Sequence, residues 1–343
     1  MSKTNSPPTK KRVNLALQGG GAHGAFTWGV LDAFLADGRL DIAAISGASA
    51  GAMNAVVLSD GLREGGVEGA RRQLEQFWRG VSLDGKMSRQ QRDLFDTFLG
   101  FLDPLKIGQS IAENAATYIS PYQSNPLDIN PLRDVVERLI DFPALRASDH
   151  LELFISATCV RTGKIRIFRR PELTIDMLMA SACLPTVFKA VQVGDEYYWD
   201  GGYMGNPALF PFFTETDVED VILVQINPIE RKDIPHTSRE ILNRLNEITF
   251  NAALLQEFRA IDFVARLIDA GRLDGTHYKK MRMHLVEGGA ALDDYAADTK
   301  TDAGFNFFKT LFAIGSKAGE KFLAENFDSI GARGTLELQE LLV

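Results

Sequence analysis

Twice within its first 60 residues, the chain places a short apolar run before a glycine turn and a helix-compatible segment after that turn. The apolar runs are residues 13–17 and 42–45, and the segments that follow them are residues 22–38 and 50–58. Short apolar runs are typical of strands buried on both faces, and parallel strands need a crossover between them. The alternation therefore predicts an α/β fold, with a mainly parallel sheet covered by helices.

The rest of the chain continues this pattern without an internal repeat, which favours one large domain. We expect a hairpin turning at Gly163, strands near residues 191–199, 221–226 and 281–286, and helical segments over much of residues 64–120, over 174–183, in two stretches between Ser238 and Gly271, and over 305–327.

The charge and the apolar segments exclude two classes of protein. A formal net charge of −8 argues against nucleic-acid binding, which uses an excess of Lys and Arg to neutralise phosphates. No segment reaches the length of about 18 apolar residues that a membrane-spanning helix needs. Residues 1–12 are basic and contain two prolines but lead into no apolar signal region, so they predict a flexible leader. We expect a cytoplasmic protein.

The second glycine turn contains Gly47-Ala48-Ser49-Ala50-Gly51, which fits the pattern G-x-S-x-G. In hydrolases with this pattern the two glycines allow a sharp turn from strand to helix, which exposes the serine hydroxyl above the sheet. A serine between glycines can also be a helix N-cap in a closely packed α/β protein. Because the flanking strand and helix match the hydrolase context, we favour Ser49 as a nucleophile and Gly47 and Gly51 as the glycines of its elbow.

The first glycine turn, Gly19-Gly20-Gly21-Ala22-His23-Gly24, presents consecutive backbone N–H groups at a helix start, where negative charge is stabilised. As a dinucleotide-binding loop it fits G-x-G-x-x-G, with Asp41 near the position of a ribose-binding acid. In a hydrolase it supplies the donors that an acyl-transfer oxyanion needs. A nucleotide-binding α/β module leaves the Ser49 turn unexplained, whereas the hydrolase interpretation accounts for both turns.

A serine nucleophile needs a base that accepts its proton. Chain order allows a triad of Ser49, Asp200 and either His277 or His284, although a histidine in an apolar strand is more often structural. Asp200 stands between an aromatic extended segment and a Gly-Gly turn. A partly desolvated carboxylate can itself act as the base. The residues leave both a Ser-His-Asp esterase and a direct Ser49–Asp200 pair open.

These segments together resemble the patatin-like phospholipases. The resemblance covers roughly residues 13–226 and rests on four segments in the order of the family: Gly19-Gly20-Gly21-Ala22-His23-Gly24, Gly47-Ala48-Ser49-Ala50-Gly51, Ala180-Ser181-Ala182-Cys183-Leu184-Pro185-Thr186-Val187-Phe188 and Asp200-Gly201-Gly202. It implies a three-layer α/β/α fold and a single catalytic domain at residues 13–343. The motifs occupy about 13–226 of that domain, and a C-terminal helical extension occupies about 238–343.

The resemblance also implies a carboxylic-ester hydrolase that uses a Ser-Asp dyad, without a histidine, metal or cofactor. Ser49 attacks the ester carbonyl, Asp200 accepts its proton, and an acyl-enzyme forms and is hydrolysed. The oxyanion is held by backbone N–H groups of the first glycine turn, at Gly19, Gly20, Gly21 and Ala22. One position departs from the family: His23 stands where Arg or Lys is usual, and a neutral histidine adds no fixed positive charge.

The substrates implied are fatty-acyl esters, including phospholipids, met in solution or at the periphery of a membrane. Three apolar clusters are candidates to line an acyl channel or rest on a lipid surface, at residues 94–105, 211–213 and 305–312. Apolar stripes of this kind more often face a protein core.

Overall fold

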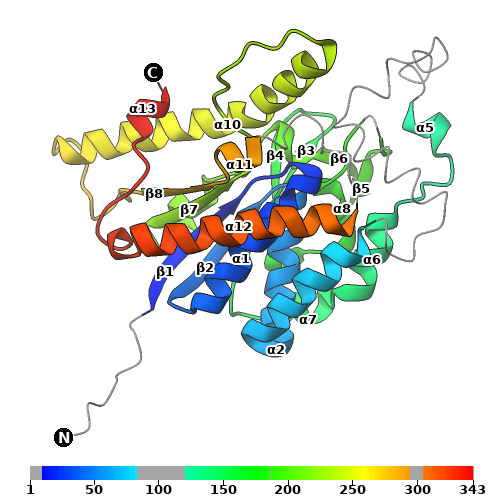
Figure 1. The fold of residues 1–343 in the computed structure, drawn as a ribbon, viewed down its shortest axis with the longest axis horizontal. Helices are drawn as coiled ribbons and strands as arrows, with labels where there is room; N and C mark the ends of the chain where they lie inside the picture. Colours follow the sequence, from blue (N-terminus) through cyan, green and yellow to red (C-terminus); the bar gives the residue numbers. More distant parts are fainter. Residues whose placement is uncertain (1–9, 83–119, 186, 294–303, 343) are drawn as a thin grey trace, which may run out of the picture.

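The computed structural model describes residues 10–82, 120–185, 187–293 and 304–342. The apolar cluster at 94–105, most of the helical region expected before residue 120, and residues 1–9 of the expected leader lie outside the described residues. The described chain folds as a central sheet with helices on both faces (Figure 1).

The sheet has eight strands, ordered β5-β6-β3-β2-β1-β7-β8, with β4 paired to β3. The pairs β2–β3, β1–β2, β1–β7 and β7–β8 are parallel, and only the pairs of β4, β5 and β6 are antiparallel. The expected α/β class with a mainly parallel sheet is confirmed. The strands are β1 (Lys11–Leu17), β2 (Leu40–Gly47), β3 (Glu152–Cys159), β4 (Ile165–Arg169), β5 (Val191–Val193), β6 (Glu196–Asp200), β7 (Asp220–Gln225) and β8 (Arg282–Glu287).

Helices enclose a hydrophobic core on each face of the sheet. The larger core lies under α1, α2 and α12, and the smaller lies under α10. Successive residues of a strand point to opposite faces, so Leu15 and Leu17 of β1 enter the larger core and Ala16 the smaller. The helices are α1 (Gly24–Asp37), α2 (Ala50–Gly80), α5 (Pro121–Ser124), α6 (Pro131–Leu139), α7 (Phe142–Ala147), α8 (Ile175–Ser181), α9 (Pro211–Thr214), α10 (Ser238–Asp269), α11 (Ala290–Asp293), α12 (Phe305–Asn326) and α13 (Leu338–Leu342).

Helix α2 folds back on itself. Gly65 and Gly66 have non-helical dihedral angles, and Gly66 has a φ of 60°, which glycine tolerates best. The two halves then cross closely, since a Cβ at Gly69 would lie 2.4 Å from the carbonyl oxygen of Gly61. The return brings Trp78 back to Asn54, whose Oδ1 accepts the indole N–H at 3.0 Å.

The C-terminal region is built into the same body as the motifs. Strand β8 extends the sheet beyond β7, and α12 packs along α1 (Figure 1). The two helices approach so closely that a Cβ at Gly29 would lie 2.0 Å from the Phe312 carbonyl oxygen, and one at Gly315 would lie 2.0 Å from that of Phe26. Helices α1 and α12, from distant parts of the chain, therefore share one core.

The expectation of two helical stretches between Ser238 and Gly271 is wrong. A single helix, α10, runs from Ser238 to Asp269. It begins with a capping box formed by Thr237 and Glu240, and no glycine or proline interrupts it. Neither of the residues that break helices is present, so the segment continues as one helix.

Candidate functional site

Ser49 occupies a sharp turn between β2 and α2. Its φ of 51° and ψ of −123° lie in a region that residues with a side chain rarely adopt. The glycines on either side allow this turn by close packing. A Cβ at Gly47 would lie 2.7 Å from the carbonyl carbon of Gly51, and one at Gly51 would lie 2.1 Å from the Leu17 oxygen. The pentapeptide thus has the strained conformation that exposes a nucleophilic serine.

The first glycine turn lies directly against this elbow. A Cβ at Gly19 would lie 2.7 Å from both the Ala48 oxygen and the Ser49 Cβ. Amide side chains hold the turn in place. Asn206 Oδ1 accepts the Gly19 N–H at 2.6 Å, and Asn227 Nδ2 donates to the Gly19 carbonyl at 2.7 Å. The Gly19 N–H is therefore occupied within the protein.

Two of the other residues of the predicted oxyanion loop lie at an apolar cavity that is described below. Gly21 and Ala22 line it beside Ser49, in a 3-10 turn that leads into α1. Ala50, the first residue of α2, also lines the cavity. The first N–H groups of a helix have no acceptor within it. Ala50 was not among the predicted donors, although it directly follows Ser49, the predicted nucleophile, where such elbows supply a donor. With Gly19 occupied, the candidate donors become Gly20, Gly21, Ala22 and Ala50.

Strand β3 brings Asp200 to Ser49. Gly47 ends β2 and pairs with Ile155 of β3, while Asp200 ends β6 and pairs with Ala157. Strand β4 pairs with one side of β3 along this stretch. Strands β2 and β6 therefore both pair with the other side of β3, where the end of β2 faces the end of β6. Two strand residues span roughly 7 Å. Since Ser49 follows Gly47 by two residues, the nucleophile turn and Asp200 lie over the same part of the sheet.

The Asp200 carboxyl is fully buried. Its Oδ1 accepts the Gly202 N–H at 2.7 Å, and its Oδ2 has no partner of hydrogen-bond geometry within the described chain. Burial raises the pKa of Asp200 to about 7, although the Gly202 N–H and the nearby Ser49 hydroxyl both act to lower it. The hydroxyl is thus close enough to affect the pKa without a formed hydrogen bond to Oδ2. Catalytic hydrogen bonds of this kind often tighten only with substrate bound.

The end of α8 holds both residues through their backbones. The Ser49 N–H lies 3.1 Å from the carbonyl oxygen and 3.1 Å from the hydroxyl of Ser181. The Asp200 N–H donates to the carbonyl of Cys183 at 2.8 Å. Ser181 and Cys183 lie in the Ala-Ser-Ala-Cys segment that carried part of the resemblance, yet their sequence positions did not reveal this bracing.

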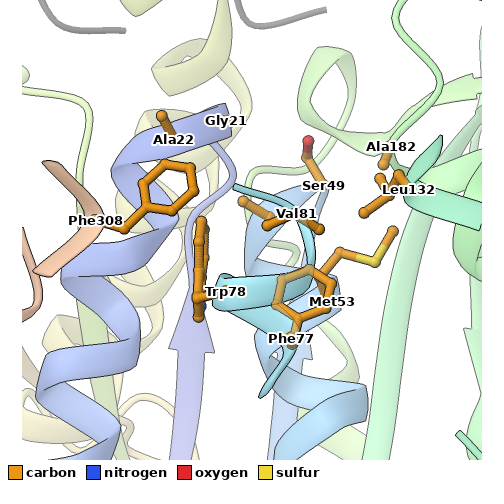
Figure 2. Close-up of a pocket in the computed structure, with 11 residues that line it drawn as sticks. Gly21, Ala22, Ser49, Met53, Phe77, Trp78, Val81, Leu132, Ala182 and Phe308 are labelled. Carbon is orange, nitrogen blue, oxygen red and sulfur yellow. The ribbon is translucent and has the colours of Figure 1, made fainter. Parts of the chain in front are cut away.

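Ser49 lies at the rim of a narrow apolar cavity, whose volume is about 30 Å³ for a water-sized sphere and which opens to solvent. Figure 2 shows the serine hydroxyl above the apolar side chains. The indole N–H of Trp78 is already bound to Asn54, so the Ser49 hydroxyl is the side-chain polar group that the described lining residues offer a ligand. The larger side chains of the wall come from α2 and its C-cap, α6 and α12: Met53, Phe77, Trp78, Val81, Leu132 and Phe308.

The apolar clusters expected near the site divide between cavity and core. Phe308, from the cluster at 305–312, lines the cavity, whereas Phe305 and Phe307 are buried in the larger core. In the cluster at 211–213, Phe212 is fully buried in the smaller core.

The described geometry brings neither candidate histidine to Ser49. His284 is buried in β8, three strands from β2, where its Nε2 lies 3.0 Å from Asp220 Oδ1. His277 is exposed and bound to Asp274 before β8 begins. Strands β2, β1, β7 and β8 all run in the same direction. The Ser49 turn follows the end of β2, so the start of β8 lies at the opposite ends of the strands.

Asp41 and His23 also take definite places. Asp41 lies at the start of β2 beside Arg12, with 3.6 Å between the charged atoms, so it is at the edge opposite the glycine turn and cannot serve a nucleotide bound there. His23 is buried at the end of the 3-10 turn, and its backbone N–H donates to the Gly20 carbonyl at 3.3 Å.

The described residues contain neither a membrane-crossing helix nor a metal-binding cluster. No helix in the described ranges is long and apolar enough to cross a membrane. Within the same ranges, no group of three His, Cys, Asp or Glu side chains is arranged to hold a metal ion.

The comparisons with known proteins agree with the motifs. A family model described as patatin-like phospholipase matches residues 15–213, more than half of the chain. Among solved structures, the chain is similar to VipD from Legionella pneumophila, with 15% sequence identity and a TM-score of 0.39, over 91% of this chain and 69% of that one. No curated protein matches the sequence significantly.

Proposed function

Because this chain belongs to the patatin-like phospholipase family, a family of lipid acyl hydrolases, we propose that it cleaves fatty-acyl esters, phospholipids among them, as a carboxylic-ester hydrolase with Ser49 as nucleophile and Asp200 as base. The observation that carries this proposal is the strained Ser49 turn at the rim of an apolar cavity, beside a buried carboxyl with a pKa of about 7. A base is most effective when its pKa lies near the working pH.

In the first half of the reaction, Asp200 Oδ2 takes the proton of the Ser49 hydroxyl as Oγ attacks the ester carbonyl carbon. The carbonyl oxygen becomes an oxyanion, which the N–H groups of Gly21, Ala22 and Ala50 stabilise at the starts of α1 and α2. The bond to the leaving alcohol then breaks, the alcohol takes the proton from Asp200, and the acyl group remains on Ser49.

In the second half, Asp200 takes a proton from a water molecule, whose oxygen attacks the acyl carbonyl. The tetrahedral intermediate collapses, Asp200 returns the proton to Ser49 Oγ, and the fatty acid leaves. The apolar cavity is the natural seat of the acyl chain, since each buried CH₂ contributes about 0.8 kcal/mol to binding. No cofactor takes part in these steps.

The test measures hydrolysis of a medium-chain acyl ester by the wild type and by Ser49→Ala and Asp200→Asn. We expect each variant to lose at least about a thousandfold in kcat, as for other members of a nucleophile–base pair. A fluorophosphonate should label the wild type at Ser49. Turnover that survives Ser49→Ala would reject the nucleophile, and full activity of Asp200→Asn would reject the base.

A further inference from the structure

Asn54 connects three parts of the site by hydrogen bonds. Its side chain is fully buried on α2, one turn after the nucleophile. Nδ2 donates to the Gly24 carbonyl at 3.0 Å and to the Ala50 carbonyl at 3.1 Å, while Oδ1 accepts the Trp78 indole N–H at 3.0 Å. Both amide hydrogens and the oxygen are thus in use. Asn54 thereby joins the starts of α1 and α2 to the cavity wall.

Trp78 is fixed from several sides. Its Cη2 would lie 3.0 Å from a Cβ at Gly24, and its ring packs edge-on against Phe308 and Phe77, with centroids 5.1 and 5.4 Å away. Figure 2 shows the ring in the wall of the cavity below the level of the Ser49 hydroxyl. Among the contacts that Trp78 makes with described residues, the hydrogen bond to Asn54 is the directional one that sets how the ring is turned, since the others are apolar.

We propose that Asn54 is a positioning residue that fixes the Trp78 indole as the wall of the acyl cavity, so that this pair determines which acyl chains the enzyme accepts. The proposal rests on the proposed acyl hydrolysis and adds the determinant of its chain selectivity. An indole held in one orientation limits the depth of the cavity for every substrate. An indole released from Asn54 can turn aside and admit a longer chain.

The pair also couples selectivity to the catalytic donors. Gly24 is the last residue of the first glycine turn and begins α1, and Ala50 begins α2. A change at Asn54 therefore alters kcat for all esters alike through these two helix starts. It alters the ratio between long and short esters only through Trp78. The ratio of kcat/KM separates the two effects, because a uniform change cancels in it.

The experiment uses p-nitrophenyl esters of butanoic, octanoic and dodecanoic acid with the full chain. The readout is the ratio of kcat/KM for the dodecanoyl ester to that for the butanoyl ester. We expect Trp78→Ala to raise this ratio by about tenfold or more, because it opens space for several methylenes. We expect Asn54→Ala and Trp78→Phe each to raise it by about threefold. The double variant Asn54→Ala/Trp78→Ala should show the same ratio as Trp78→Ala alone, because both substitutions remove the same hydrogen bond.

The matched control is Trp28→Phe. Trp28 is as buried as Trp78, with 5% against 3% of its surface exposed, and it packs on Phe312 of α12 outside the cavity. The Trp28→Phe variant should leave the ratio of kcat/KM values at that of the wild type even if the melting temperature falls. If Trp78→Ala does not fold, Trp78→Phe and Asn54→Ala carry the test.

The outcomes separate this inference from the proposed function. Ester hydrolysis that depends on Ser49, with a ratio that stays at the wild-type value in the Trp78 and Asn54 variants, overturns the inference alone. The inference is also overturned if the ratio in the double variant changes by the product of the two single fold-changes, because the two residues would then act independently. A wild type without Ser49-dependent hydrolysis overturns the proposed function and the inference with it.

Discussion

At the scale of single residues, ionisation of the buried Asp200 carboxyl should have opposite effects on stability and on activity. Its pKa is raised by burial from an ordinary value of 3.8 to about 7, so the folded state holds a proton that the unfolded state has already released. Where the folded state binds more protons, stability falls as pH rises. In its proposed role as the base, however, Asp200 works only when it is ionised.

We therefore predict that kcat/KM rises with pH through about 7, while the free energy of unfolding falls over about pH 4 to 7 by an amount on the order of 4 kcal/mol. Asp200→Asn should remove this fall and be more stable than the wild type at about pH 8. Urea titrations of both proteins across this range measure the difference. A wild type that gains stability relative to Asp200→Asn as pH rises would contradict the raised pKa.

His284 has a structural environment instead of a catalytic one. Its two ring nitrogens contact Asp220 and Thr335, each at 3.0 Å, and its side chain is inaccessible to solvent. Removing one partner from a buried polar group leaves the other unsatisfied.

We predict that His284→Ala loses about 2 to 4 kcal/mol of unfolding free energy and keeps the wild-type kcat/KM per folded molecule. His277→Ala, at an exposed site, should change neither quantity. Calorimetry combined with active-site titration measures both. A loss of kcat in His284→Ala that is still folded would instead support the triad of Ser49, Asp200 and His284.

At the scale of elements, the fold-back of α2 places the cavity wall behind the nucleophile. The crossing depends on Gly61 and Gly69, where a side chain would meet backbone atoms. Alanine ordinarily stabilises a helix interior relative to glycine by about 0.5 to 1 kcal/mol. At this crossing the sign should reverse, because the backbone cannot move aside without separating the two halves.

We predict that Gly69→Ala lowers the free energy of unfolding by about 1 to 3 kcal/mol and also lowers kcat/KM, since Trp78 lies at the end of the displaced half. The control is Glu68→Ala, one residue earlier on the solvent side, which should stay within about 0.5 kcal/mol. Chemical denaturation gives the comparison. Equal stability of the two variants would argue against the close crossing.

At the scale of the whole molecule, helix α12 completes the body that carries the motifs. α12 contributes Phe308 to the cavity and packs on α1 through Gly315, so the wall of the site depends on a segment more than 250 residues after the nucleophile. The body that carries the motifs thus includes both β1 and α12.

We predict that Gly315→Ala lowers the free energy of unfolding by about 1 to 3 kcal/mol, because its Cβ would meet the Phe26 carbonyl oxygen. Lys317→Ala, exposed on the same helix, should change it by less than about 0.5 kcal/mol. Limited proteolysis of Gly315→Ala should release the C-terminal region earlier than in the wild type. Unchanged stability would show that α12 can shift away from α1 at no cost.

The sequence alone determined the features that are local in the chain. Apolar runs and glycine turns predicted β1, β2 and the two turns, because the periods of strands and helices are written in neighbouring residues. The G-x-S-x-G pattern pointed to Ser49, and an acid before two glycines pointed to Asp200. Only the tertiary structure decided that β3 brings these two together end to end, that Asn206 occupies the Gly19 amide, and that Asn54 reaches Trp78. These contacts join residues far apart in the chain, and close packing, which no local pattern encodes, selects them.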